Sequence, residues 1–146
     1  MAQLSETRVL VTGGTSGLGR AMAQALVQAG AQVALTSRDA ERAQATAAEL
    51  GAGAVGIQLD VRDPTSVSAA VDGAYGMLDG LDVLVNNAGI GMRTVNPRFM
   101  TEPQPFWEVA PAGFRDVLET KAIGTFLGAS ASLAAPESLP LHPQPG

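Results

Sequence analysis

The chain has 146 residues, which is enough for one domain with a hydrophobic core and too few for two domains of ordinary size. Hydrophobic residues make up 46% and charged residues 16%, as is typical of globular rather than disordered proteins. A net charge of −5 with only nine Lys and Arg argues against a nucleic-acid partner, and the lack of cysteine excludes disulfides and thiolate metal sites.

Two further classes are disfavoured by the sequence. The apolar run near the N-terminus is cut short by Gly13 and Gly14, unlike that of a signal peptide, and no segment has the about 20 apolar residues of a membrane span. We therefore expect a cytoplasmic protein without a membrane partner. The only histidine is His142, in a Pro-rich stretch, where we expect a solvated side chain and no metal site.

The first elements in chain order are a strand over 8–11, a glycine-rich turn over 12–19 and a helix that ends at Gly30. We expect this helix to bury one apolar face. The residues of that face are Leu18, Met22, Ala25, Leu26 and Ala29.

The alternation of strand and helix then continues along the chain. The expected elements are a strand over 32–36, a helix over 39–50, a strand over 55–59, a helix that Asp63 and Pro64 open and that runs to about Met77, and a strand over 81–85. Apolar strands that alternate with helices are typical of a parallel sheet covered on both faces. We therefore predict an α/β fold with three αβα layers, ending after about four strands and five helices.

The last third of the chain is less regular. Residues 91–111 contain several prolines and aromatics and predict a long connection, after which helical spacing begins at about Ala112. Four of the eleven residues from Pro136 are prolines, which excludes a helix interior or a central strand. We expect a domain over 1–135 and a disordered Pro-rich tail over 136–146.

The strongest chemical signal is the segment Thr12-Gly13-Gly14-Thr15-Ser16-Gly17-Leu18-Gly19, between the first strand and the first helix. Its glycines allow a tight turn and a close approach to a pyrophosphate, and the helix N-terminus offers free N–H groups and a positive dipole end. The segment has no lysine, which disfavours a nucleoside triphosphatase. A methyltransferase that binds adenosylmethionine stays open at this point, although it leaves the next two features without a role.

The end of the second strand carries Ser37 and Arg38. In dinucleotide-binding folds an acidic residue here selects NAD, whereas a guanidinium can bind a 2′-phosphate with two parallel hydrogen bonds. The pair therefore favours NADP over NAD. The alternative is that Arg38 is a solvated loop residue.

Three motifs in this order resemble the short-chain dehydrogenase/reductase family: the Thr-Gly-x-x-x-Gly-x-Gly segment, Asp60-Val61 after the third strand, and Asn86-Asn87-Ala88-Gly89 after the fourth. The resemblance covers about residues 7 to 128 and implies a Rossmann-type fold with NADP, or else NAD, as cofactor. It implies a pyrophosphate site at Gly13, Ser16, Gly17, Leu18 and Gly19, an adenine site at Asp60 and Val61, and further cofactor contacts at Asn87, Ala88 and Gly89.

The resemblance also shows what is missing. The family transfers hydride between a nicotinamide cofactor and an alcohol or carbonyl, using a tyrosine, a lysine four residues later, a serine and a relay asparagine. Here the only tyrosine, Tyr75, and the only lysine, Lys121, are far apart. Lys121 stands where the relay asparagine is usual, and we expect it on the solvent side of its helix. Ser130, Ser132 and Ser138 come too early to match, so we expect no catalytic residue.

A complete domain of this type needs about 250 residues, so about half is expected to be missing, and the Pro-rich end suggests a shifted frame or an alternative end. Two functions stay open. One is the NADP-binding portion of an oxidoreductase, which binds nucleotide without turnover. The other is a non-catalytic nucleotide-binding or partner-binding module that self-associates or pairs with a full-length relative, because the fourth strand would be a long apolar sheet edge.

Overall fold

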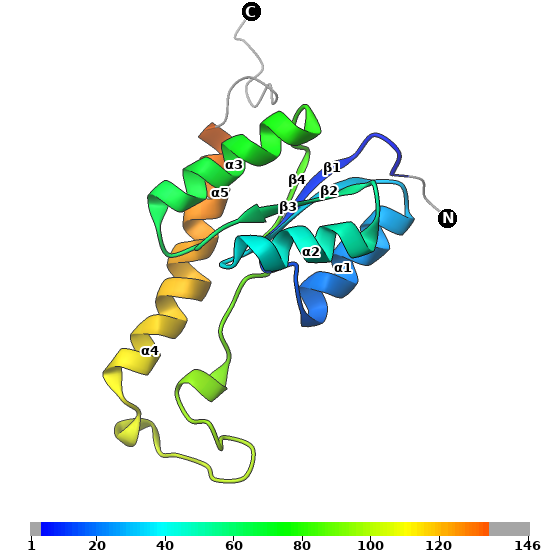
Figure 1. The fold of residues 1–146 in the computed structure, drawn as a ribbon. Helices are drawn as coiled ribbons and strands as arrows, with labels where there is room; N and C mark the ends of the chain where they lie inside the picture. Colours follow the sequence, from blue (N-terminus) through cyan, green and yellow to red (C-terminus); the bar gives the residue numbers. More distant parts are fainter. Residues whose placement is uncertain (1–3, 135–146) are drawn as a thin grey trace, which may run out of the picture.

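The structure, a computed structural model, describes residues 4–134. Its strands form one parallel sheet in the order β3-β2-β1-β4 (Figure 1). The predicted parallel sheet is therefore confirmed. β2 and β3 are added on one side of β1, and β4 is added on its other side, so the strand order reverses between β1 and β4. The strands are β1 (Arg8–Val11), β2 (Gln32–Ser37), β3 (Ala54–Gln58) and β4 (Val83–Val85).

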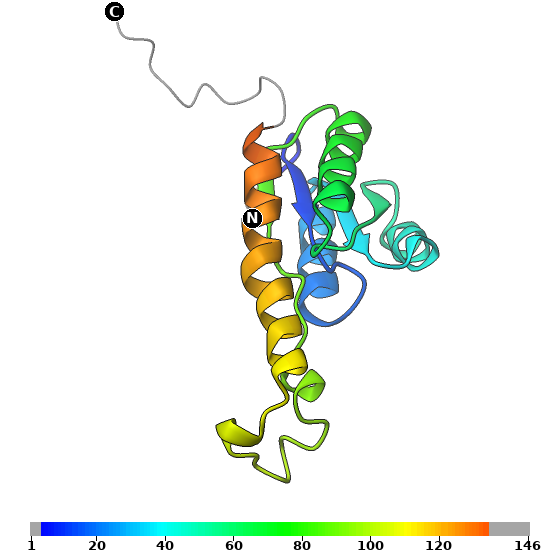
Figure 2. The ribbon, with the colours of Figure 1, turned by 90° about the vertical axis from the view of Figure 1, so that its left-hand side faces the viewer.

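Five α-helices connect or follow these strands within the described residues. They are α1 (Gly17–Gln28), α2 (Ala40–Leu50), α3 (Pro64–Leu78), α4 (Pro111–Leu118) and α5 (Gly124–Ala134). A single π-helical turn, η3 (Glu119–Ile123), joins α4 to α5, so that the two run as one long helical column (Figure 2). None of the helices in this part of the chain has the length and hydropathy needed to cross a membrane.

The helix ends follow the local signals in the sequence. The Asp39 carboxylate accepts a hydrogen bond from the N–H of Arg42 at 3.1 Å, and Asp63 accepts one from Thr65 at 3.0 Å. Both aspartates are therefore N-caps, which satisfy backbone donors that a helix start leaves free. Gly30 has a φ of +93° directly after α1, the left-handed geometry that ends a helix.

The core lies on both faces of the sheet. On one face Val9, Val11, Val33 and Leu35 are buried against α1 and α2. On the other face Leu10 and Ala34 pack against α3, which contributes residues such as Val71, and against α5. This alternation along β1 and β2 confirms the three-layer arrangement, with α1 and α2 on one side and α3 and α5 on the other (Figures 1 and 2).

Two details of the expected elements are wrong. The fourth strand spans only Val83–Val85, because Leu81 is buried against the core and Asp82 turns to pair with Arg8. The sheet edge is thus shorter than expected. In α1 the buried residues are Gly19 and Ala23, whereas Leu18 is 70% exposed, because the helix packs through its small residues and directs Leu18 away from the sheet.

The connection over 91–111 is long, as predicted, but contains two single 3₁₀ turns, at Met92–Thr94 and Phe106–Glu108. With α4 it forms a lobe that projects beyond the sheet (Figure 1). Phe106 and Trp107 meet edge to face with ring centroids 5.4 Å apart, and both rings are largely exposed. The tail predicted over 136–146, including His142, lies outside the described residues.

Candidate functional site

The carboxyl ends of β1, β2, β3 and β4 open into one cavity of about 580 Å³. It lies beside the point where the strand order reverses, which is where open parallel sheets bind ligands. The glycine segment, the β2 end, the β3 end, the β4 end and α4 each supply part of its wall. The lining residues are Gly13, Thr15, Ser16, Leu18, Gly19, Thr36, Ser37, Arg38, Arg42, Leu59, Asp60, Val61, Arg62, Asn87, Ala88, Gly89, Ile90, Thr94, Asp116 and Thr120.

The glycine segment forms an anion cradle at the N-terminus of α1. Gly13 and Gly17 have φ values of +68° and +52°, and a side chain at Gly17 would project into open space. The Ser16 side chain makes no capping bond, and the first helical hydrogen bond is from Arg20 N to Ser16 O at 3.2 Å. The N–H groups of the first turn therefore point outward without helical partners and can bind phosphate oxygens.

Thr12 and Asn87 connect this cradle to the end of β4. The Thr12 hydroxyl oxygen accepts hydrogen bonds from the N–H groups of Asn87 and Ala88, each at 3.0 Å. In return the Asn87 side-chain amide donates to the carbonyl oxygens of Thr12 and Gly13 at 3.1 Å. The cradle and the β4 end are thus one rigid unit.

Two cations line the cavity: Arg38, directly after β2, and Arg42, in the first turn of α2. The Arg38 carbonyl accepts a hydrogen bond from the Gln58 side chain at 3.0 Å, which fixes the loop to β3. The nearest carboxylate in the chain, Asp39, is occupied as the cap of α2. Among the described residues neither arginine forms an ion pair, so both are available for an anionic ligand.

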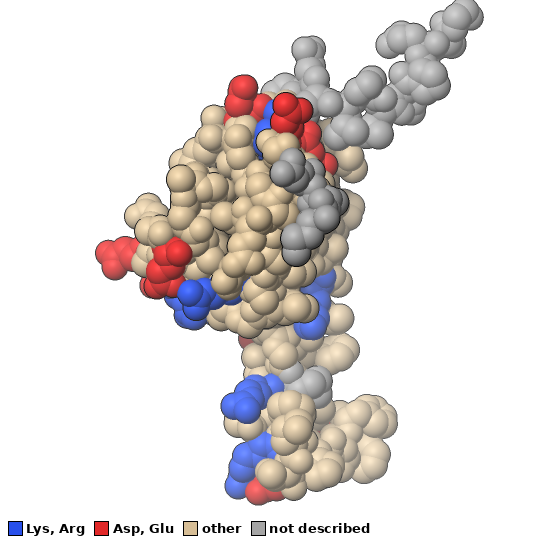
Figure 3. All heavy atoms as spheres, turned by 90° about the vertical axis from the view of Figure 1, so that its right-hand side faces the viewer, with Lys and Arg blue, Asp and Glu red and all other residues tan. Residues whose placement is uncertain are grey.

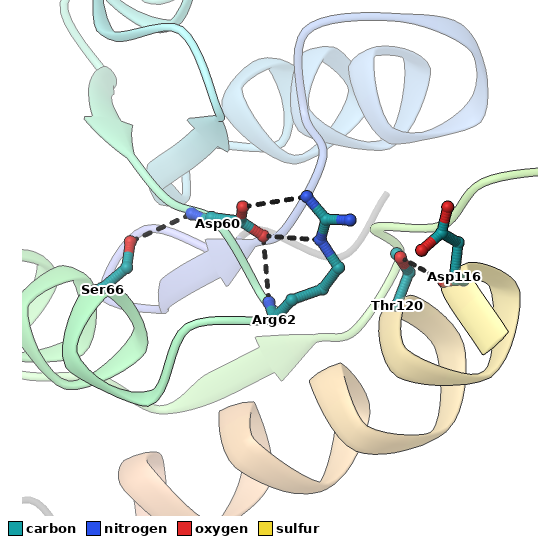
Figure 4. Close-up of polar contacts among 5 residues, drawn as sticks. All are labelled: Asp60, Arg62, Ser66, Asp116 and Thr120. Carbon is teal, nitrogen blue, oxygen red and sulfur yellow. Dashed lines mark hydrogen bonds and ion pairs between the residues drawn. The ribbon is translucent and has the colours of Figure 1, made fainter. Parts of the chain in front are cut away.

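At the end of β3, Asp60 and Arg62 form a compact ion pair (Figure 4). The Asp60 N–H donates to the Ser66 hydroxyl at 3.0 Å. Arg62 approaches the carboxylate with its backbone N–H at 3.0 Å and with Nε and Nη2 at 3.3 Å. The Arg62 hydrogen bond, opposed by partial desolvation, lowers the pKa of Asp60, which is therefore ionised at neutral pH.

The outer wall comes from the helical column. Asp116 and Thr120 line the cavity, and the Thr120 hydroxyl donates to the Asp116 carbonyl at 2.9 Å. Lys121 is exposed, and its Cε lies 3.4 Å from where a side chain at Gly89 would begin. The expectation of a lysine on the solvent side of its helix is therefore confirmed.

Charge is unevenly distributed despite the net value of −5. On the face shown in Figure 3, Lys and Arg side chains lie mainly over the lower part of the domain and the projecting lobe, whereas many Asp and Glu lie at the upper end. Figure 1 places the carboxyl ends of the strands toward that lower part. The cavity itself is lined by charges of both signs, namely Arg38, Arg42 and Arg62 with Asp60 and Asp116.

The comparison with protein families decides the assignment. The model of the short chain dehydrogenase family matches residues 7–137. The chain belongs to this family. Short-chain dehydrogenases bind nicotinamide dinucleotide, and the glycine cradle and cavity described above fit such a group.

Individual proteins that are similar to this chain are members of the same family. The chain is 37% identical over 128 residues to a 3-oxoacyl-acyl-carrier-protein reductase of Aquifex aeolicus, covering 85% of this chain and 48% of the relative. It is 42% identical over 88 residues to a sorbitol dehydrogenase of Cereibacter sphaeroides, covering 60% and 34%. A 3-ketoacyl-(acyl-carrier-protein) reductase from Brucella melitensis, solved with NADH, superposes with a TM-score of 0.77 at 32% identity, covering 88% and 49%. The chain thus spans between about a third and a half of the length of these relatives.

All the residues expected from the sequence to contact the cofactor line the cavity, except Gly17, whose position in the cradle was described above. Sequence reasoning missed several lining residues. Of these, Arg42 stands one helical turn after Arg38, and Asp116 and Thr120 are four residues apart on one helix face, so spacing was the available signal. The missed residues are Thr15, Thr36, Arg42, Leu59, Arg62, Ile90, Thr94, Asp116 and Thr120.

Proposed function

We propose that this chain is the NADP-binding portion of a short-chain oxidoreductase that acts on an alcohol or carbonyl substrate in the cytoplasm. The observation that carries the proposal is one cavity that joins the free N–H groups of α1 to two arginines, Arg38 after β2 and Arg42 in α2, that form no ion pair among the described residues. The first group suits a pyrophosphate and the second suits an additional phosphate on the ribose. Bound nicotinamide would supply the hydride donor or acceptor.

The preference for NADP rests on charge at the β2 end. A carboxylate that hydrogen-bonds the ribose 2′-hydroxyl would repel a 2′-phosphate, but Ser37 and Arg38 stand there and Asp39 is committed to its cap. The Ser37 hydroxyl oxygen accepts a hydrogen bond from the backbone N–H of Asp39 at 3.2 Å, and this bond holds the loop between β2 and α2 beside the cavity. Arg38 and Arg42 would together surround the phosphate.

The same proposal includes the absence of turnover by these 146 residues. The sequence contains no tyrosine followed by a lysine four positions later, because Asp79 stands four residues after its one tyrosine, Tyr75, which belongs to α3. No residue of the chain can thus act as the usual proton donor to a carbonyl oxygen. Binding and orientation of the cofactor are what this portion performs.

Calorimetric titration tests the binding. NADP⁺ is titrated into the chain and into Arg38→Ala, and NAD⁺ into both. We expect NADP⁺ to bind the parent chain more tightly than NAD⁺ by about tenfold or more, the value of one charge-assisted contact, and expect Arg38→Ala to abolish the difference. Equal affinities in the parent chain would overturn the NADP preference, and no binding at millimolar nucleotide would overturn the whole proposal.

A parallel assay tests turnover. NADPH absorbance is followed with the pure chain and a panel of ketones and aldehydes. No oxidation above the protein-free rate is expected. Steady oxidation would show that another residue performs the proton transfer, and the proposal of an inactive portion would then be wrong.

A second candidate function is a partner-binding module. It is favoured by the outer edge of β4, which pairs with no strand among residues 4–134, and by Val83, which is 42% exposed there. Sedimentation of the nucleotide-free chain at increasing concentration distinguishes this candidate. A monomer that binds NADP⁺ supports the first function alone.

A further inference from the structure

We propose that Arg62 is a positioning residue for the base of the nucleotide: it fixes the Asp60 carboxylate so that one oxygen is held ready to accept a hydrogen bond from an exocyclic amino group. The inference rests on the proposed function and deepens it. It assigns Arg62 a share in selecting an aminopurine over a base with a carbonyl at the same position. Nothing in the sequence pattern singled out Arg62.

The first argument is the hydrogen-bonding capacity of Asp60. An ionised carboxylate offers about four acceptor positions on its two oxygens. Oδ1 accepts two bonds, from the Arg62 N–H and Nε, whereas Oδ2 accepts one, from Nη2. Oδ2 therefore keeps an acceptor position, and Asp60 lines the cavity.

The second argument is that little else restrains this side chain. Ser66 binds the backbone N–H of Asp60, and the Asp63 N–H donates to the Asp60 carbonyl at 3.1 Å, so these contacts shape the turn and leave the carboxylate free to rotate. Figure 4 shows the Arg62 side chain curling back onto Asp60, so that backbone and guanidinium hold the carboxylate from the same residue. Without the guanidinium the backbone N–H of residue 62 would still hold Oδ1, but the Nε and Nη2 contacts would be lost and with them the fixed direction of Oδ2.

The third argument is the charge of the wall across the cavity. Asp116 faces the same space from α4, and Arg62 lies between it and Asp60 (Figure 4). Asp60, and more weakly Asp116 and Glu119, raise the pKa of Arg62, so its charge is permanent. A base with an amino group can donate into this acceptor-rich wall, whereas a base with a carbonyl oxygen there would meet a carboxylate oxygen.

The fourth argument separates Arg62 from the phosphate-binding arginines. Arg38 and Arg42 form no ion pair among the described residues, whereas both carboxylate-facing nitrogens of Arg62 are occupied by Asp60. Arg62 is thus committed to a carboxylate and would contribute little to phosphate affinity. The two functions can be separated by mutation.

The test compares ratios of affinity rather than single affinities. The parent chain, Arg62→Ala and the matched control Arg38→Ala are titrated with NADP⁺, with its deamino analogue that carries hypoxanthine, and with NAD⁺. We expect the parent chain to prefer NADP⁺ over the deamino analogue about tenfold, as for one hydrogen bond to a charged group. Arg62→Ala should reduce this preference to within about twofold and keep the ratio of the NAD⁺ and NADP⁺ dissociation constants. Arg38→Ala should keep the preference over the deamino analogue and reduce the ratio of the NAD⁺ and NADP⁺ dissociation constants.

If Arg62 has only a structural role, Arg62→Ala will weaken the binding of all three ligands equally and leave both affinity ratios unchanged. That result would overturn the inference and leave the proposed function intact. Tighter NADP⁺ binding by Arg62→Ala would show that the guanidinium competes with the base, and would also overturn it. If the parent chain binds no nucleotide, both proposals fail. Should Arg62→Ala not fold, Arg62→Gln, which keeps a polar side chain but lacks the guanidinium that contacts both Asp60 oxygens, is judged by the same ratios.

Discussion

Thr12 and Asn87, 75 residues apart in sequence, hold the nucleotide cradle together through reciprocal hydrogen bonds. The Thr12 hydroxyl oxygen accepts hydrogen bonds from two backbone N–H groups after β4. The Asn87 side-chain amide donates hydrogen bonds to the carbonyl oxygens of the first two residues of the glycine segment. Thr12 is buried, so water does not substitute for these partners. The geometry of the cradle therefore depends on a contact between two strand ends.

Replacing Thr12 by Val tests this dependence. The hydroxyl is lost at nearly constant volume, so the Ala88 N–H loses its acceptor and the Asn87 N–H keeps only the Val85 carbonyl oxygen. We expect the free energy of unfolding to fall by about 1–3 kcal/mol in urea denaturation, together with weaker NADP⁺ binding. Thr12→Ser keeps the hydroxyl and should lose less than half as much. Equal stability of the Val and Ser variants would contradict the role of the hydroxyl.

Gly19 offers a second test, because a Cβ there would collide with the Gly13 carbonyl oxygen and with the Asn87 side-chain amide. Gly19→Ala should destabilise the chain by about 1–3 kcal/mol, the usual cost of overpacking, and weaken nucleotide binding. Gly76→Ala is the matched control, since Gly76 also lies within a helix but a Cβ there meets nothing within 4 Å. That variant should be stabilised by about 0.5–1 kcal/mol through helix propensity. Thermal and urea unfolding of the two proteins provide the comparison.

Sequence patterns predicted the layers and strand direction because apolar runs and glycine turns are local signals. The strand at Arg8–Val11 and the cap at Asp63 needed no knowledge of the rest of the fold. The fourth strand was predicted two residues too early, since Leu81 is apolar for burial against the core rather than for strand pairing. Composition alone does not separate these two reasons for an apolar residue.

In the candidate site, too, local motifs could be predicted from the sequence and contacts between distant residues could not. Glycines and Asn87 are recognisable because their spacing carries the signal, but the pairing of Asn87 with Thr12 is visible only in three dimensions. Arg62 was not singled out, because the sequence does not show whether an arginine two positions after Asp60 pairs with it or extends into solvent. Lys121 is exposed as expected, but the π turn in which it lies has no sequence signature and was not predicted.

Packing of α2 on the sheet depends on Gly56 in β3. A Cβ at this position would overlap backbone atoms of Ala43 and Gln44, which are not able to move as a flexible side chain does. We expect Gly56→Ala to lower the free energy of unfolding by about 3 kcal/mol, the upper end for overpacking. Because α2 carries Arg42, the variant should also lose part of its NADP⁺ affinity. Retention of the parent's urea midpoint would show that α2 can shift without cost.

The ion pair at the opposite end of the sheet predicts a pH dependence. Arg8 donates its backbone N–H and two guanidinium nitrogens to the Asp82 carboxylate, each at 2.8 Å. These hydrogen bonds lower the pKa of Asp82 to about 2, below the about 3.9 of an unfolded chain. A group whose folded pKa is depressed stabilises the protein above its unfolded pKa. That contribution is lost as the pH falls from about 4 through 2.

Asp82→Asn isolates this contribution, because the amide keeps the shape of the side chain and removes its titration. The thermal midpoint of the variant should lie a few degrees below that of the parent at a constant interval from pH 7 to about pH 5. Below pH 4 the interval should shrink, since the parent protonates Asp82 on unfolding and then in the folded state. The pair is partly exposed, so 0.5 M salt should narrow the interval at pH 7 as well. An interval that stays constant down to pH 2.5 would mean that the Arg8 contacts do not lower the pKa of Asp82 in solution.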